Sequence, residues 1–132
     1  MTDFSNLLDA TEEFMRRAGQ LDRTGFATAT CDELREFRRN LLSSEYSEYL
    51  EAEHLTNELA AVVQELLDVI VVAWGSVLAY VGPERARRAA AEVARANLDK
   101  VIGEGLPIKR ADGKVLKPEG WRPPDIAGVL QA

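Results

Sequence analysis

The stretch SEYSEYLEAEHLTNELAAVVQELLD, residues Ser44 to Asp68, decides the fold. Its apolar residues recur with the spacing of helices rather than of strands. Two acidic pairs, Glu45 with Glu48 and Glu65 with Asp68, each stand three positions apart, so each pair shares one helix face. The stretch therefore predicts two helices that each carry a pair of carboxylates.

The rest of the chain extends this pattern to an all-α, four-helix bundle-like fold. We expect helices at about residues 4–18, 30–53, 57–80 and 83–102, with Thr30 and Thr56 as N-caps and a stop at Gly82-Pro83. A short connection near His54 makes the second and third helices antiparallel neighbours. In that hairpin the two acidic pairs come level and face each other.

A different composition begins near residue 103. Residues 1–102 are predicted to form the helical domain that carries the candidate site. Residues 103–132, rich in Gly, Pro and basic side chains, are predicted to form an ordered C-terminal arm of the same domain. The arm cannot build a core of its own, but its apolar residues, Trp121 among them, allow it to dock.

Charge and composition exclude several classes of protein. The net charge of −6 argues against a general nucleic-acid-binding surface. The N-terminus has no secretory signal pattern, and the single cysteine, Cys31, suits a reducing compartment. The apolar run from Leu59 to Val81 is long enough to span a membrane, but Gln64, Glu65 and Asp68 lie inside it. We therefore expect a cytoplasmic protein with no membrane partner, whose third helix is a buried core helix.

Converging carboxylates repel one another unless a cation neutralises them, and Mg²⁺ or Mn²⁺ prefers oxygen ligands. The spacing thus predicts a metal site formed by Glu45, Glu48, Glu65 and Asp68. The alternative, solvated charges that happen to fall at helical spacing, is weaker for Glu65 and Asp68 because apolar residues flank them. A di-iron site of the ferritin type needs two Glu-x-x-His motifs, and the chain has one histidine, His54.

The segments SEYSE (44–48) and ELLD (65–68), separated by sixteen residues, resemble the E-E-x-x-E and E-x-x-D motifs of the all-α nucleoside triphosphate pyrophosphohydrolases. This superfamily includes MazG-like enzymes, dimeric dUTPases and phosphoribosyl-ATP pyrophosphohydrolases. EVARANLDK (92–100) is similar to the family's fourth-helix segment, and RADGKVLKPEGWRPPDI (110–126) to the arm of the MazG-like dUTPase branch. The resemblance covers about residues 34–129.

The resemblance implies an enzyme that uses Mg²⁺ or Mn²⁺ to release pyrophosphate and a nucleoside monophosphate, with dUTP as the leading substrate. The four acids would be the catalytic and metal-binding residues. Substrate binding is implied for the following residues: Asn97, Lys100, Arg110, Lys114 and Lys117. In the family, the segment that holds Phe14 and Gln20 can help to line the base pocket, although the pattern alone favours Phe14 as a core residue.

One position departs from the family pattern. Ser44 stands where the first Glu of E-E-x-x-E is expected, and a hydroxyl is a poorer metal ligand than a carboxylate, so the implied site is weaker or differently metallated. Two alternatives stay open: a phosphoribosyl-ATP pyrophosphohydrolase, and a non-catalytic helical module that senses nucleotides. The wide apolar third helix and the resemblance both predict a homodimer or a higher homo-oligomer.

Overall fold

The structure is a computed structural model that describes residues 6–21 and 32–132. Within these ranges the chain is helical, with one isolated β-bridge and no β-strand. The all-α prediction is therefore confirmed for the described residues. The helices are α1 (Leu7–Arg17), α2 (Asp32–Glu51), α3 (Leu59–Val81), α4 (Pro83–Leu98) and α5 (Ile126–Gln131), and a π-helical segment (Ala52–Thr56) follows α2.

The chain forms two compact units, Met1–Pro83 and Glu84–Ala132. The predicted division into a helical domain, residues 1–102, and a C-terminal arm, residues 103–132, stays a prediction. The second unit includes most of α4 because the C-terminal arm packs along this helix. Each unit is described separately below.

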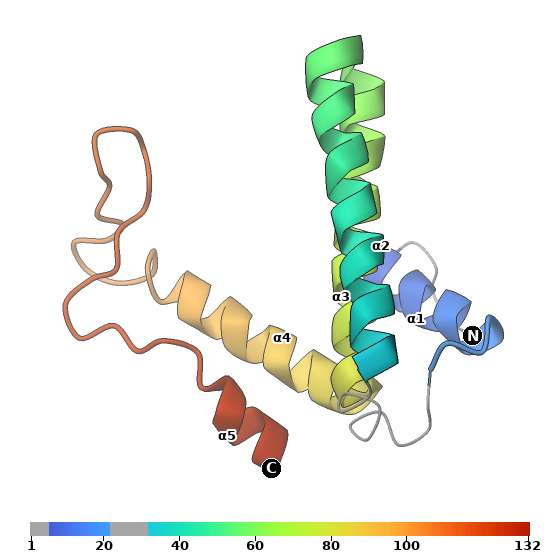
Figure 1. The fold of residues 1–132 in the computed structure, drawn as a ribbon. Helices are drawn as coiled ribbons and strands as arrows, with labels where there is room; N and C mark the ends of the chain where they lie inside the picture. Colours follow the sequence, from blue (N-terminus) through green and yellow to red (C-terminus); the bar gives the residue numbers. More distant parts are fainter. Residues whose placement is uncertain (1–5, 22–31) are drawn as a thin grey trace. The chain divides into compact units, whose positions relative to one another are not determined.

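In the first unit, α2 and α3 form an antiparallel hairpin, and α1 packs against α3 (Figure 1). The start of α2 pairs with the end of α3: the Arg35 guanidinium lies 5.5 Å from the ring centroid of Tyr80. The most buried residues of this unit include Met15 on α1 and Leu78 and Ala79 on α3. The hydrogen bonds from Arg38 of α2 to Val72 and Ser76 of α3 fix which faces of the two helices meet.

The turn between α2 and α3 differs from the prediction in detail. The α-helix ends at Glu51, and the π-helical segment closes with Asn57 in the left-handed conformation (φ 50°). Glu58, not Thr56, is the residue before α3. The Thr56 hydroxyl instead donates to the Ala52 carbonyl and accepts from the Glu58 amide. The expected cap Thr30 lies outside the described residues, as does Cys31.

The predicted burial of α3 is wrong for most of its length in the single chain. Only Gly75, Leu78 and Ala79 of this helix are buried, and several large apolar side chains upstream are exposed. We call them the α3 apolar stripe: Leu59, Val63, Leu66, Leu67 and Ile70. By length and composition alone, α3 could cross a membrane. Only 11% of the apolar 18-residue window on which this finding rests is buried within the chain.

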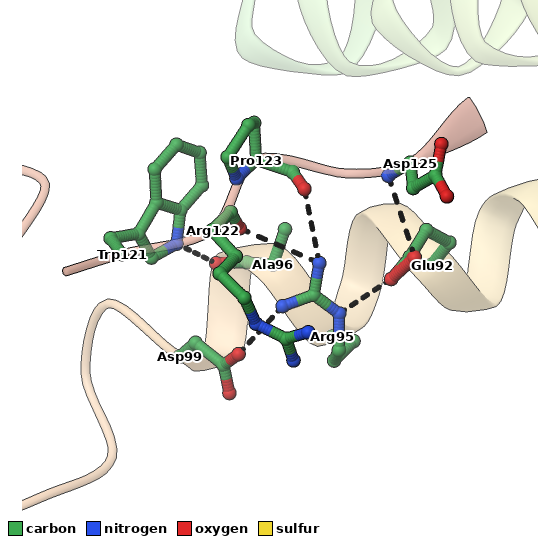
Figure 2. Close-up of polar contacts among 8 residues, drawn as sticks. All are labelled: Glu92, Arg95, Ala96, Asp99, Trp121, Arg122, Pro123 and Asp125. Atoms are coloured by element: carbon green, nitrogen blue, oxygen red, sulfur yellow. Dashed lines mark hydrogen bonds and ion pairs between the residues drawn. The ribbon is translucent and has the colours of Figure 1, made fainter. Parts of the chain in front are cut away.

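In the second unit, the arm packs against α4. The Trp121 indole Nε1 donates to the Ala96 carbonyl at 2.7 Å. Figure 2 shows Arg95 of α4 reaching the carbonyl oxygens of Arg122 and Pro123 while it pairs with Glu92 and Asp99. These contacts anchor the middle of the arm to α4.

The ends of α4 and the arm also differ from expectation. Pro83 opens α4 as predicted, but the helix ends at Leu98, and hydrogen-bonded turns carry the chain on to Ile102. Within the arm, the turn that contains Asp112 is closed by the bridge between Lys109 and Val115. The short helix α5 at the C-terminus was not predicted, since Gly128 lies inside it.

Candidate functional site

The hairpin brings the two acidic pairs together. Carboxylate oxygens of Glu45 on α2 and of Glu65 and Asp68 on α3 all lie within 4.8 Å of one another. All three side chains are half-buried, whereas Glu48 is exposed at the edge of the group. We call these four residues the acidic cluster.

The electrostatics of the acidic cluster are unfavourable when all its members are charged. Burial raises the pKa of the Glu45 carboxyl, and the neighbouring Glu48, Asp68 and Glu65 raise it further. The pKa of the Glu65 carboxyl is raised in the same way, by burial first and then by Glu48 and Asp68.

Two atoms of the acidic cluster lack partners. Glu45 Oε2 and Glu65 Oε2 are buried and accept no hydrogen bond among the described residues. A buried acceptor that stays unsatisfied costs about 1–3 kcal/mol. A hard divalent cation binds to such oxygen atoms and removes the repulsion between the carboxylates. The donor set and its orphaned oxygens therefore fit the predicted metal chemistry.

A cavity of about 320 Å³ opens beside the acidic cluster, and Glu45 forms part of its wall. This volume is at the lower end of the range of about 300–1,000 Å³ that is typical of small-molecule sites. The cavity lies among α1, α2 and α3, and its apolar lining is Phe14, Met15, Phe37, Leu41, Val71 and Val72. Its polar lining comes from Thr11, Gln20 and Arg38 in addition to Glu45.

Phe14 and Gln20 therefore both border a cavity next to the acids. The expectation that Phe14 is a core residue is wrong, because its side chain is 64% exposed. Phe37, on the opposite helix, is 47% exposed and borders the same cavity. Two aromatic side chains at a partly open cavity can pack against a planar ligand.

The predicted substrate-binding residues belong to the second unit, whereas the acidic cluster belongs to the first. Asn97 Oδ1 accepts a hydrogen bond from Lys100 Nζ at 3.3 Å. Lys100 and Lys117 both place their ammonium groups over Trp121, 5.0 and 5.2 Å from the ring centroid. The role of these residues in binding stays a prediction.

The two remaining predicted residues flank the turn of the arm. Both Arg110 and the backbone amide of Lys114 donate to the Asp112 carboxylate. The pKa of Asp112 is lowered mainly by Arg110, so the guanidinium already has an anionic partner. A phosphate that binds Arg110 has to compete with that carboxylate.

Arg38 and Gly75 were missed by the sequence analysis. Arg38 is buried, and Gly75 provides the space for its guanidinium. A signal was present, because Arg38 stands four residues after Leu34 and three before Leu41, on an apolar face of α2.

Comparison with the family models of known proteins gives no match, and neither does comparison with curated proteins.

Proposed function

We propose that this protein is a metal-dependent nucleoside triphosphate pyrophosphohydrolase that releases pyrophosphate and a nucleoside monophosphate. dUTP or another deoxynucleotide is the leading substrate. The observation that carries the proposal is the convergence of Glu45, Glu65 and Asp68 around buried oxygens without partners. The resemblance of the acidic motifs and the arm to this superfamily supports the same activity.

The four residues of the acidic cluster would hold Mg²⁺ or Mn²⁺, which would neutralise the triphosphate and activate the attacking water. The water oxygen would bond to the α-phosphorus and lose a proton to solvent, while the bond from this phosphorus to the oxygen that bridges it to the β-phosphate breaks and pyrophosphate leaves. Because Glu45 belongs both to the acidic cluster and to the cavity wall, a base in the cavity would keep the phosphates close to the carboxylates. The protein thus contributes orientation as well as charge.

We also propose that two copies pair through the α3 apolar stripe. Leu59 is 78% exposed, and the other stripe residues recur along the same helix at spacings of three or four. A contiguous apolar stripe of this kind marks an interaction surface. A second copy satisfies it in the cytoplasm, whereas a membrane would have to accept Glu65 and Asp68 at about 2.5–3.5 kcal/mol each. A dimer at micromolar concentration in detergent-free light scattering is expected, and a monomer would contradict the pairing.

The test of the activity is a panel of nucleoside triphosphates, with phosphoribosyl-ATP included, incubated with Mg²⁺ or Mn²⁺ while pyrophosphate release is followed. Release from dUTP or a related deoxynucleotide is expected. Preferential release from phosphoribosyl-ATP would favour the first alternative. Nucleotide binding without release from any substrate would favour the sensing module. No release together with no metal binding by calorimetry would contradict the proposed function.

A further inference from the structure

Arg38 is a buried cation whose hydrogen-bond partners among the described residues carry no charge. Its side chain is 5% exposed, and among the described residues it forms no ion pair: its partners are neutral oxygens of Ser76 and Val72. Burial without a carboxylate is costly for a charged group, and it lowers the pKa of the guanidinium from its usual value. An arginine nevertheless stays charged at neutral pH, so the site holds a positive charge whose direct hydrogen-bond partners, Ser76 and Val72, are neutral.

The orientation of this guanidinium is fixed by α3. Arg38 Nε donates to Ser76 Oγ, and Arg38 Nη2 donates to the Val72 carbonyl, both at 3.0 Å. The helix surface at Gly75 is flat enough to receive the group, since a Cβ there would lie 2.5 Å from Arg38 Nη2. A glycine inside a helix costs about 1 kcal/mol relative to alanine. The close approach of the guanidinium explains why this position is a glycine.

The free side of Arg38 borders the cavity. Its side chain is part of the cavity wall together with Thr11 and Glu45. The contacts to Ser76 and Val72 use only some of the N–H donors of the guanidinium. The Thr11 hydroxyl donates to the Leu7 carbonyl, so its oxygen remains available as an acceptor. The cavity therefore offers a strong donor and an acceptor inside apolar and aromatic walls.

We infer that the cavity holds the nucleobase of the substrate and that Arg38 donates to the carbonyl oxygen that stands where an amino base carries its exocyclic amine, which selects keto bases over amino bases. The inference rests on the proposed function and adds to it the residue that determines the base specificity. A phosphate is the less fitting occupant, because Phe14 and Phe37 present aromatic surface to the cavity. The carbonyl and N–H of a lactam ring match a donor next to an acceptor.

The discrimination follows from the chemistry of arginine. A guanidinium has donors and no acceptor, so an exocyclic amine at the same place puts donor against donor beside a positive charge. Uracil and cytosine differ at one such position, as do hypoxanthine and adenine. A hydrogen bond to a charged group contributes about 1.5–3 kcal/mol, which corresponds to a preference of roughly tenfold to hundredfold.

The test compares kcat/KM for dUTP with dCTP, and for dITP with dATP, in wild type and in Arg38→Met. The wild type is expected to prefer the keto member of each pair by roughly tenfold or more. In Arg38→Met the values for dUTP and dITP fall and those for dCTP and dATP do not, so that the preference disappears. Arg39→Met is the matched control, because Arg39 is exposed on the same helix, and it should keep the wild-type preference.

A second variant keeps the inference falsifiable if Arg38→Met does not fold. Ser76→Ala removes the oxygen that holds Arg38 Nε and leaves the charge in place, so it should reduce the preference without abolishing it. A folded Arg38→Met with an unchanged keto preference would overturn the inference. An equal loss for all four substrates would also overturn it, since that result places Arg38 on the phosphates or the sugar.

A binding measurement separates this inference from the proposed function. Calorimetry with the non-hydrolysable α,β-imido analogues of dUTP and dCTP requires no turnover. Suppose that the wild type binds the dUTP analogue more tightly, that Arg38→Met abolishes this preference, and that no substrate releases pyrophosphate. This result would refute the proposed enzymatic activity and support the proposed base selection. Pyrophosphate release with no difference between the analogues would keep the enzyme and refute the base selection.

Discussion

Glu45 on α2 and Glu65 on α3 hold carboxylate oxygens within 4.8 Å of each other, and each residue also has one buried oxygen that finds no hydrogen-bond partner in the described part of the chain. The helices are held in register by contacts elsewhere, such as that of Arg38 with Ser76. Packing therefore imposes the proximity of the two acids, which do not attract each other. When both carboxylates are ionised they repel each other, and a bound cation or a proton removes this repulsion.

The first prediction concerns the pH dependence of stability in the presence of a chelator. The pKa values of Glu45 and Glu65 are raised above their usual 4.5 in the folded state. The native state thus binds more protons than the unfolded state between the usual and the raised value, so stability falls as the pH rises through that window. Glu65→Gln should raise the thermal midpoint at about pH 8 and leave it nearly unchanged at about pH 4.

The measurement is thermal unfolding of both proteins across the pH range, followed by circular dichroism. Glu36→Gln is the matched control, since Glu36 is exposed on α2 and does not belong to the acidic cluster. A Glu65→Gln midpoint below that of the wild type at about pH 8 would show that Glu65 gains a partner in the folded state, contrary to the geometry.

The second prediction concerns the cation. Addition of Mg²⁺ to chelator-treated protein should raise the thermal midpoint at about pH 8, because binding to the native state alone stabilises it by mass action. The effect should fade towards about pH 4, where protons occupy the same oxygens. Differential scanning fluorimetry with a Mg²⁺ titration measures it. An equal Mg²⁺ effect in wild type and Asp68→Asn would place the cation outside the acidic cluster.

The third prediction concerns turnover. Asp68→Asn keeps the shape of the side chain but removes one charge from the acidic cluster, so pyrophosphate release should fall by at least a hundredfold, roughly 2.7 kcal/mol or more in transition-state stabilisation. The far-ultraviolet circular dichroism spectrum should not change. Retained wild-type turnover in a folded Asp68→Asn would mean that the chemistry takes place elsewhere.

The fourth prediction concerns Ser44, which precedes Glu45 on α2 and is exposed. If a carboxylate at this position contributes a ligand, Ser44→Glu should raise either the rate of pyrophosphate release or the number of Mg²⁺ ions bound per chain in calorimetry. Ser43→Glu adds the same charge one residue earlier and is the control. No difference between the two variants would show that position 44 is peripheral to the site.

The acidic cluster could be predicted from the sequence because the reasons for it are local. Residues three apart share a helix face, and the turn near His54 makes the hairpin. The sequence does place Arg38 on an apolar face of α2, but the contact that buries its guanidinium could not be predicted in the same way. That contact depends on Gly75, which lies on another helix and leaves room for the guanidinium because it has no side chain. No local pattern connects these two positions.

The hydrophobic periodicity also led to a wrong prediction of burial for several apolar residues. It marks Phe14 and the α3 apolar stripe as apolar faces, and it assumes that the chain itself buries them. The first unit has too few described elements to cover every face of α3, so Phe14 borders a cavity and the stripe remains exposed. What fills such a surface is a property of partners and ligands, which a single sequence does not encode locally.

The fifth prediction tests the contact between Arg38 and Gly75. Gly75→Ala should be destabilising by about 1–3 kcal/mol through overpacking, although alanine normally stabilises a helix interior by about 1 kcal/mol. The reason is that the new Cβ would lie 2.5 Å from Arg38 Nη2 and 3.0 Å from Met15 Sδ. In an Arg38→Ala background the first clash is absent, so the same substitution should cost less. Urea unfolding of the four proteins in this double-mutant cycle measures the coupling, and an equal cost in both backgrounds would show that Gly75 does not accommodate Arg38.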